Sequence, residues 1–387
     1  MEFEQKVRPD IFGARVRAAR SVSRMTQENA ASELGMSRTT LVAIEAGKRP
    51  VSSSEVRRIA ELFKVAEGEL LDADAPSLDM PVEFRSSATA VESDDEVIVA
   101  SILNRLASSV IQLEQLVGFT QPLLDIPEVV ISRDESIEQQ AEDAALVLRA
   151  RLGLGIGPIQ DLNGLMESEL GVRIFERALP SKVSGAMAFA DGVGGFVLLN
   201  SKHPIYRRRV TAAHELAHVV LRQKGMAVHF SDDFFESKEE KFCDIFGCCF
   251  LMPAAAVRKK ANELKKIVGK FTVRELLTLT LYFNVSMEAL VRRMVSLGLL
   301  PNGTYERLRA DGLGLKHQDT VRSELGISPE PPIFTARTML LAMAAHKRDL
   351  LSEQQIASML ELDLLSVRKA LESQSEDGQE SALEMVL

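Results

Sequence analysis

The spacing of apolar positions predicts a mainly helical chain with one small region of strands. Residues 12–71 have the pattern of a run of short helices, and a segment without periodicity, rich in Ser, Asp, Ala and Pro, follows at about 72–96. Apolar stretches at Val172–Phe175, Ala186–Ala190 and Phe196–Leu199 predict strands, the last two around a Gly-rich turn typical of a hairpin. We therefore expect an α+β fold, mainly α, with a short antiparallel sheet.

Further helices are expected on both sides of these strands. Residues 137–170 predict two helices, with Pro158 at a first helical position. The pattern then predicts helices from about 209 to 223 and from 238 to 251, and more helix over 254–300. The tail includes one helical segment after about residue 330, but it carries no recognisable motif, and no internal repeat is apparent.

One amphipathic segment has a heptad pattern. Its apolar side chains recur at steps of 4, 3, 4, 3 and 4, at Val99, Leu103, Leu106, Val110, Leu113 and Val117. The segment is under three heptads long, so it fits a dimer-forming helix and a helix packed on its own domain about equally well. Both interpretations stay open.

Composition indicates several domains and an uneven distribution of charge. The 387 residues are too many for one ordinary core, and 46% hydrophobic with 26% charged residues is typical of soluble globular domains. The net charge is −9, yet residues 8–58 carry 10 Lys and Arg against 5 Asp and Glu. A basic block on an acidic chain points to nucleic acid as its partner.

The cysteines and the lack of a targeting segment indicate the cytoplasm. Cys243, Cys248 and Cys249 lie in one short segment, so they offer no disulfide framework and favour a reducing compartment. We interpret them as core residues rather than as a metal cluster or redox switch, because their spacing is not that of metal ligands. The N-terminus lacks a signal peptide, and no run of 18 apolar residues predicts a membrane span.

Residues 26–45 have the layout of a helix-turn-helix. Gly35 stands where the first helix ends in a turn that requires positive φ, and Ser37 suits the N-cap of the next helix. Leu41 and Ile44 give that helix an inward face. The positions left to enter a major groove include Arg38, Thr39 and Ala43.

The sequence here resembles the XRE family, the phage-repressor-like helix-turn-helix. Thr26–Ala31, Leu34–Ser37 and Ile44–Pro50 match the family pattern. The resemblance implies that double-stranded operator DNA is bound by a homodimer. It implies these contacts: Gln27 to a phosphate, Arg38 and Thr39 to bases with Ser37, Thr40 and Ala43 beside them, and Arg17, Arg20 and Arg24 to the DNA backbone. The alternative is a small helical bundle that contacts protein.

A second motif, His214-Glu215-Leu216-Ala217-His218, carries metal chemistry. Two imidazoles at i and i+4 lie on one helix face, so both can reach one Zn²⁺. Glu215 is then placed as a general base that takes a proton from a water attacking a carbonyl. The alternative, two solvated histidines beside a structural glutamate, fits poorly with the apolar residues on both sides of the motif.

The third ligand is expected on the next helix. Glu240 is the leading candidate and Glu239 its rival, while Asp244, four residues after Glu240, would orient a ligand histidine. The alternative for the two glutamates is a solvated helix start, where carboxylates are favoured in any case. His203, His229 and Tyr206 could assist catalysis or bind substrate, but a surface position is the simpler interpretation for them.

This part of the chain resembles the ImmA/IrrE metallopeptidase family. Thr211–His218, Glu240–Gly247 and Leu251–Pro253 match its motifs, with Asn200 and Arg208–Arg209 ahead of them. The resemblance implies a zincin-like zinc peptidase, with His214, His218 and Glu240 as metal ligands and Glu215 as the catalytic base. It also implies a protein substrate, a repressor or a neighbouring gene product, cut in response to stress or DNA damage, with single-stranded DNA as a candidate trigger.

Two other functions remain open. One is a transcription factor whose peptidase-like domain binds zinc or a partner without cutting, and the other is an antitoxin-like or phage-defence regulator. The expected organisation is the same for all three. It comprises a five-helix DNA-binding domain over 1–72, a linker over 73–97, an amphipathic helix over 98–120, the peptidase domain over 135–300 and a helical region of unknown role over 301–387.

Overall fold

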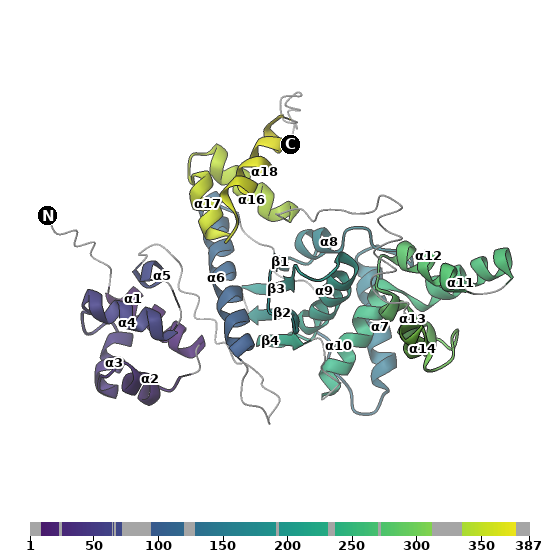
Figure 1. Ribbon diagram of the computed structural model, residues 1–387, viewed down its shortest axis with the longest axis horizontal. Helices are drawn as coiled ribbons and strands as arrows, with labels where there is room; N and C mark the ends of the chain where they lie inside the picture. Colours follow the sequence, from purple (N-terminus) through teal and green to yellow (C-terminus); the bar gives the residue numbers. More distant parts are fainter. Residues whose placement is uncertain are drawn as a thin grey trace. The chain divides into compact units, whose positions relative to one another are not determined.

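The computed structural model groups the chain into two compact units (Figure 1). The first comprises residues up to Gln121 together with those from Thr338 onward, and the second comprises Pro122–Arg337. The structure describes residues 9–22, 25–63, 65, 67–71, 94–119, 128–190, 193–230, 237–269, 272–311 and 335–376. Within these ranges the chain is mainly α with one small sheet, the expected fold class.

The N-terminal part of the first unit is a bundle of short helices. They are α1 (Pro9–Val22), α2 (Gln27–Glu33), α3 (Arg38–Glu45), α4 (Ser53–Phe63) and α5 (Glu67–Leu71). Gly35, at φ 66°, makes the turn between α2 and α3, and Ser37 caps α3 by accepting a hydrogen bond of 3.1 Å from the backbone N–H of Thr40. Leu41 and Ile44 are fully buried in this bundle. The predicted helix-turn-helix layout is therefore present.

The rest of the first unit joins a long helix to the C-terminal helices. They are α6 (Asp94–Val117), α16 (Ala336–Lys347), α17 (Glu353–Met359) and α18 (Leu364–Glu376). Arg105 on α6 forms an ion pair with Glu361, and Arg348 donates a hydrogen bond of 2.8 Å to the carbonyl of Val117. These contacts hold α6 against the C-terminal helices.

The heptad stripe of α6 is buried in the single chain. Its side chains Val99, Leu103, Leu106, Val110 and Leu113 are at most 1% exposed. This burial favours a helix packed within its own chain over an exposed dimer seam. Among the described helices, α6 is also the one long and apolar enough to cross a membrane by length and composition, a test that core helices pass as well.

The second unit is built on a four-stranded sheet. Its strands are β1 (Arg173–Arg177), β2 (Val183–Ala190), β3 (Gly194–Asn200) and β4 (Gly225–Phe230), in the order β1-β3-β2-β4. β2 runs antiparallel to both β3 and β4, but β1 runs parallel to β3. The prediction of an antiparallel sheet is therefore wrong for this pair. Two reversals of the chain, before and after β2, return β3 to the direction of β1.

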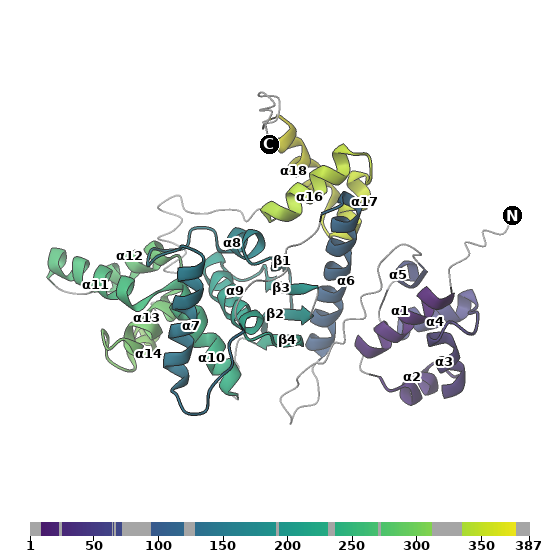
Figure 2. The ribbon, with the colours of Figure 1, turned by 180° about the vertical axis from the view of Figure 1, so that it is seen from behind.

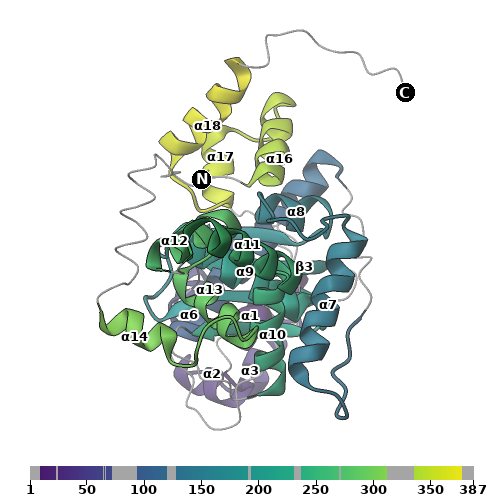
Figure 3. The same ribbon diagram turned by 90° about the vertical axis from the view of Figure 1, so that its right-hand side faces the viewer.

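Helices cover the sheet and extend beyond it. They are α7 (Ile137–Arg151), α8 (Leu162–Ser168), α9 (Ile205–Val220), α10 (Lys238–Leu251), α11 (Ala254–Val268), α12 (Val273–Phe283), α13 (Met287–Ser296) and α14 (Thr304–Ala310). α9 packs on β2 and β3, α10 packs on α9, and α7 packs on α10 (Figure 2). α11 to α14 lie at the end of the unit away from the sheet (Figure 1), so α11 and α12 stand in front of it in the view from that side (Figure 3). The helix that carries the His-Glu motif is thus enclosed between sheet and helices.

Two helix boundaries differ from the predicted ones. Pro158 does not begin a helix, because Asp161 caps α8 by accepting a hydrogen bond of 2.9 Å from the backbone N–H of Gly164. The carboxylate of Asp161 satisfies a backbone N–H group in the first turn of the helix, which Pro158 has no side-chain acceptor to do. α8 therefore begins directly after Asp161. α9 begins at Ile205, four residues before the predicted start. α10 has the predicted bounds.

Two glycines let α9 approach its neighbours closely. A Cβ added at Gly247 of α10 would lie 3.0 Å from the backbone nitrogen of His214. A Cβ added at Gly185 of β2 would lie 2.7 Å from Cγ2 of Thr211 and 3.1 Å from Oε1 of Glu215. The backbone of α9 therefore lies directly against that of α10, and side chains of α9 lie directly against the backbone of β2. This close packing positions the side chains of the candidate site.

Candidate metal centre and nucleic-acid interface

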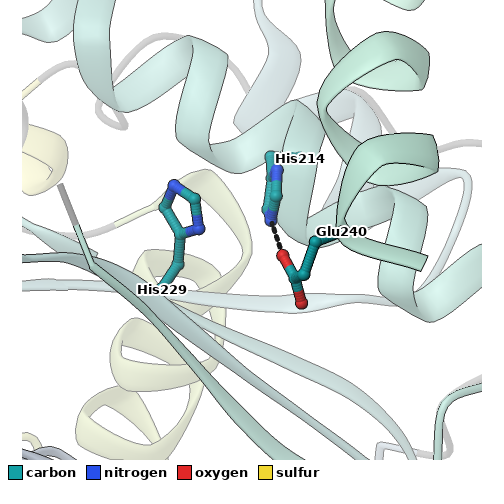
Figure 4. Close-up of side chains that lie close together, drawn as sticks. All are labelled: His214, His229 and Glu240. Carbon is teal, nitrogen blue, oxygen red and sulfur yellow. Dashed lines mark ion pairs between the residues drawn. The ribbon is translucent and has the colours of Figure 1, made fainter. Parts of the chain in front are cut away.

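Two histidines of α9 and a glutamate of α10 meet in a buried site. His214 and His218 lie one turn apart, and their Nε2 atoms are 3.1 Å from each other. Glu240 lies 3.3 Å from Nε2 of His214 (Figure 4) and 3.6 Å from Nε2 of His218. Metal bonds of about 2.0–2.1 Å at tetrahedral angles would place ligand atoms about 3.4 Å apart. The triangle of ligand atoms therefore has the size that one small metal ion requires.

The other ring nitrogens of the two histidines are fixed by acceptors. Nδ1 of His214 donates to Asp244 at 2.7 Å, and Nδ1 of His218 donates to Oε1 of Gln223 at 2.6 Å. A carboxylate and an amide oxygen can only accept, so each ring keeps its Nε2 lone pair directed at the centre. Asp244 lies where the sequence predicted it, while Gln223 was not anticipated.

Glu215 is buried beside this centre with no partner. It is fully buried, and neither carboxylate oxygen has a hydrogen-bond partner among the described residues. Burial raises the pKa of Glu215 to about 8, while the charge of His214 opposes that rise. A buried carboxyl group of this kind calls for a donor such as a water molecule, and it can take up or release a proton near neutral pH.

The charges around the centre favour a cation. Burial lowers the pKa of His214, but hydrogen bonds to Asp244 and Glu240 outweigh it and raise this pKa to about 10. Burial raises the pKa of Glu240, but the hydrogen bond to His214 outweighs it and lowers this pKa to about 2. Burial lowers the pKa of His218 to about 4. The three carboxyl groups of Glu215, Glu240 and Asp244 thus face two buried imidazoles, and the side chains of Glu240 and Asp244 keep 37% and 39% of their surface exposed.

A third histidine, considered in the sequence analysis as an aid to catalysis but interpreted more simply as a surface residue, lies beside the centre. The ring of His229, on β4, lies with its centroid 4.2 Å from that of His214, and candidate ligand atoms of His214, His229 and Glu240 lie within 4.8 Å of one another (Figure 4). Burial, together with the charge of His214, lowers the pKa of His229 to about 3. Tyr206 is buried, so the surface position expected for it is wrong, whereas His229 is half-buried and its ring faces His214.

The other residues of α10 that the sequence analysis considered differ in their burial. Glu239 is exposed, so α10 turns Glu240 and not Glu239 toward the histidines. Cys243 and Cys249 are buried in the core, as expected, and Sγ of Cys243 lies 3.4 Å from Nδ1 of His218. The thiol therefore packs against a histidine of the site.

The outward face of α3 carries the residues predicted to meet DNA. Arg38 and Thr39 are exposed, and Thr40 and Ala43 are partly exposed. The hydroxyl of Ser37 is engaged as the helix cap. The first turn of α3 thus presents polar side chains at the positions that enter a major groove in helix-turn-helix proteins.

The side chains behind α3 differ from the predicted arrangement. Arg20 forms a 2.5 Å ion pair with Glu45, and Gln27 donates a 2.8 Å hydrogen bond to the same carboxylate. The side chain of Arg20 is 14% exposed and that of Glu45 is 1% exposed. A buried carboxylate needs such partners, so Arg20 and Gln27 are both engaged within the domain, and their contacts to DNA stay predictions. Arg17 is exposed, and Arg24 lies outside the described residues.

These features define the class of the two domains. A helix with two histidines and a glutamate, set against a small sheet and facing an acidic helix, is metallopeptidase-like, and the N-terminal bundle is a helix-turn-helix domain. Residues 167–295 match the family model of the IrrE N-terminal-like domain, and residues 11–73 match a helix-turn-helix domain model. The chain therefore joins an XRE-like helix-turn-helix to a domain of the ImmA/IrrE family.

Comparisons over the whole chain add little to this assignment. No curated protein matches the chain. The crystal structure of ComR from Streptococcus suis aligns with it over 96% of both chains, at 11% identity and a TM-score of 0.16. The assignment therefore rests on the two family models and the geometry above.

Proposed function

We propose that this chain is a DNA-binding regulator whose second domain is a zinc-dependent, site-specific peptidase. The observation that carries the proposal is the triangle of His214, His218 and Glu240. Beside it lies the buried carboxyl group of Glu215, which has no hydrogen-bond partner in the part of the chain that the structure describes. Two imidazole nitrogens and one carboxylate oxygen are a ligand set that zinc prefers, and three protein ligands leave a position open for chemistry.

Each residue of the site has its own role in the proposed hydrolysis of a peptide bond. A zinc ion held by His214, His218 and Glu240 would supply Lewis-acid activation of a water molecule and of the substrate carbonyl. Asp244 keeps the ring of His214 in its binding orientation. Glu215 takes a proton from the attacking water and delivers it to the leaving amine.

The substrate we propose is a protein that acts in regulation, such as a repressor or the product of a neighbouring gene. The exposed face of α3 supports operator DNA as the partner of the first domain. The proposal includes that a homodimer binds this DNA in the cytoplasm. Cleavage would answer stress or DNA damage, with single-stranded DNA as a candidate trigger. The alternative is a regulator that binds metal without cutting, which would use the same ligands and leave Glu215 without a catalytic role.

Metal analysis combined with a cleavage assay tests the proposal. The chain purified without chelator should contain close to one zinc per molecule. It should then cut a protein encoded beside its own gene at one position, either directly or once single-stranded DNA is added. Absence of zinc would contradict the proposed site, and zinc without cleavage under either condition would favour the regulator that does not cut.

Arg38→Ala should weaken binding to the operator. If Arg38 reads a guanine in the major groove, its loss costs about 1–3 kcal/mol and relaxes specificity at that base pair. Competition mobility shifts with the specific site and with random duplex would measure the effect. Arg20→Ala serves as a comparison, because loss of its ion pair with Glu45 should lower the melting temperature of the domain instead. Unchanged operator affinity in Arg38→Ala would show that α3 is not the recognition helix.

A further inference from the structure

His229 lies beside the metal centre, and the proposed function gives it no role. Its strand, β4, pairs with β2 alone among the strands that the structure describes, so β4 is an edge of the sheet. Its direct partner on β2 is Gly185. Residues paired across antiparallel strands project from the same face, and a Cβ added at Gly185 would meet Thr211 and Glu215 of α9. His229 therefore projects toward α9.

The pairing of the two strands is irregular at this position. β2 advances by two residues, from Val183 to Gly185, where β4 advances by one residue at His229. Register shifts of this kind increase the local twist and re-aim side chains, and they are frequent beside active sites. The sheet itself therefore directs the imidazole of His229.

The ring of His229 is as close to the centre as that of a proposed ligand. The ring centroids of His214 and His218 are 4.9 Å apart, and the centroid of His229 is 4.2 Å from that of His214. A ring nitrogen of His229 is turned toward His214 and Glu240 (Figure 4), and ligand atoms of these three residues lie within 4.8 Å of one another. Ligand atoms around one tetrahedral ion are about 3.4 Å apart, a difference that rotation of the imidazole about its side-chain bonds can cover.

This spacing is too small for a histidine that holds substrate. A histidine that donates a hydrogen bond to a substrate oxygen must leave room for that oxygen between itself and the ion. The ring of His229 is closer to that of His214 than the ring of His218 is, so no such room remains between these rings. The distances favour a ligand.

We propose that His229 is a fourth, displaceable ligand of the ion and that it holds the peptidase in a latent state. The inference rests on the proposed function and adds how the same site is regulated. Zinc sites with three protein ligands keep a position for chemistry, whereas sites with four are closed. With His229 in place, neither water nor a substrate carbonyl has access to the ion, so Glu215 has no proton to take.

The fold allows His229 to leave without disturbing the other ligands. These three lie on α9 and α10, whose backbones pack against each other at Gly247. His229 lies on an edge strand, which in the described part of the chain is held by a neighbouring strand on one side. A shift of β4 would therefore open the fourth position, while the ligands of α9 and α10 keep the ion.

Counting the imidazoles bound to the ion tests the inference. X-ray absorption spectroscopy of the full chain loaded with zinc should show three imidazole ligands in the wild type and two in His229→Phe, because phenylalanine keeps the ring but has no ligand atom. His229→Ala should agree with His229→Phe. His346→Phe, a matched change in α16, should keep three. Circular dichroism spectra that match the wild type would show that the variants fold.

Binding of acetohydroxamate, a small chelator that needs open coordination positions, gives a second measurement. If the open state makes up about a tenth of wild-type molecules or less, His229→Phe should bind the chelator at least about tenfold more tightly. The same variant should cut the substrate protein without a trigger, whereas the wild type needs one.

Several outcomes would overturn the inference. Two imidazoles in the wild type, or three in His229→Phe, would show that His229 is not a ligand. Equal affinity for acetohydroxamate would show that the fourth position is already open in the wild type. A variant that keeps zinc but never cuts, while the wild type does, would make His229 a catalytic residue. A wild type without zinc would contradict the proposed function as well, whereas two bound imidazoles would leave that function intact.

Discussion

Glu215→Gln should leave the metal centre intact and remove peptidase activity. Glu215 is not one of the three residues that form the ligand triangle, and glutamine keeps its shape but cannot accept a proton from water at neutral pH. Loss of a positioned base costs about 10²–10⁴ in rate, which is readily visible on a gel. The measurement pairs zinc content with cleavage of the substrate protein, for wild type and variant side by side.

Two controls show that such a loss would be specific. DNA binding by the first domain should be unchanged. When both proteins are free of metal, the variant should also be at least as stable toward unfolding as the wild type above neutral pH. Because burial raises the pKa of Glu215 from 4.5 to about 8, the wild type loses stability as pH rises through that range, and the glutamine variant does not. Normal cleavage by the Glu215→Gln variant would show that Glu215 is not the base.

Glu240→Ala should lose zinc, whereas Glu239→Ala should keep it. The two residues are neighbours on α10, but only Glu240 lies within 3.3 Å of His214, while Glu239 is exposed. Removing a partner that merely orients a ligand costs about 10–100-fold in metal affinity, and removing a ligand should cost more. Competition with a chromophoric chelator measures both variants, and Asp244→Asn provides the intermediate case.

A different pattern would relocate the third ligand. If Glu240→Ala retained zinc while His229→Ala lost it, the ion would be held between α9 and β4 instead of between α9 and α10. The position of His229 beside His214 makes this a meaningful comparison.

The helices of the site were predictable because their signals are local. α10 has the predicted bounds since Ser237 caps its start and Pro253 prevents its continuation beyond Met252. The spacing of His214 and His218 fixes their common face once the helix is assigned. Asp244 could be assigned to a ligand histidine from sequence because its helix and that of the histidines match motifs of one family, while the structure shows that this histidine is His214.

Features that depend on distant packing were not predictable in this way. β4 was not predicted, although Met226, Val228 and Phe230 alternate along Gly225–Phe230, because a run this short is a weak signal for a strand. His229 was therefore interpreted as a surface residue. The ion pair of Arg20 joins residues 25 positions apart, so its sequence neighbourhood suggested only a free basic side chain. The parallel pairing of β1 with β3 depends on where two reversals leave the chain, and no local periodicity reports that.

The close approach of α9 to α10 at Gly247 also bears on which ions the site accepts. A side chain can rotate to admit a larger ion, but two backbones in contact are stiff, because packed interiors resist expansion. Calcium needs bonds of about 2.3–2.6 Å and six or more oxygen ligands, so it would have to push α10 away from α9. Because Gly247 has no side chain and α10 therefore lies against α9, we expect the proposed site to favour a small ion over a large one, even though Gly247 is not itself a proposed ligand.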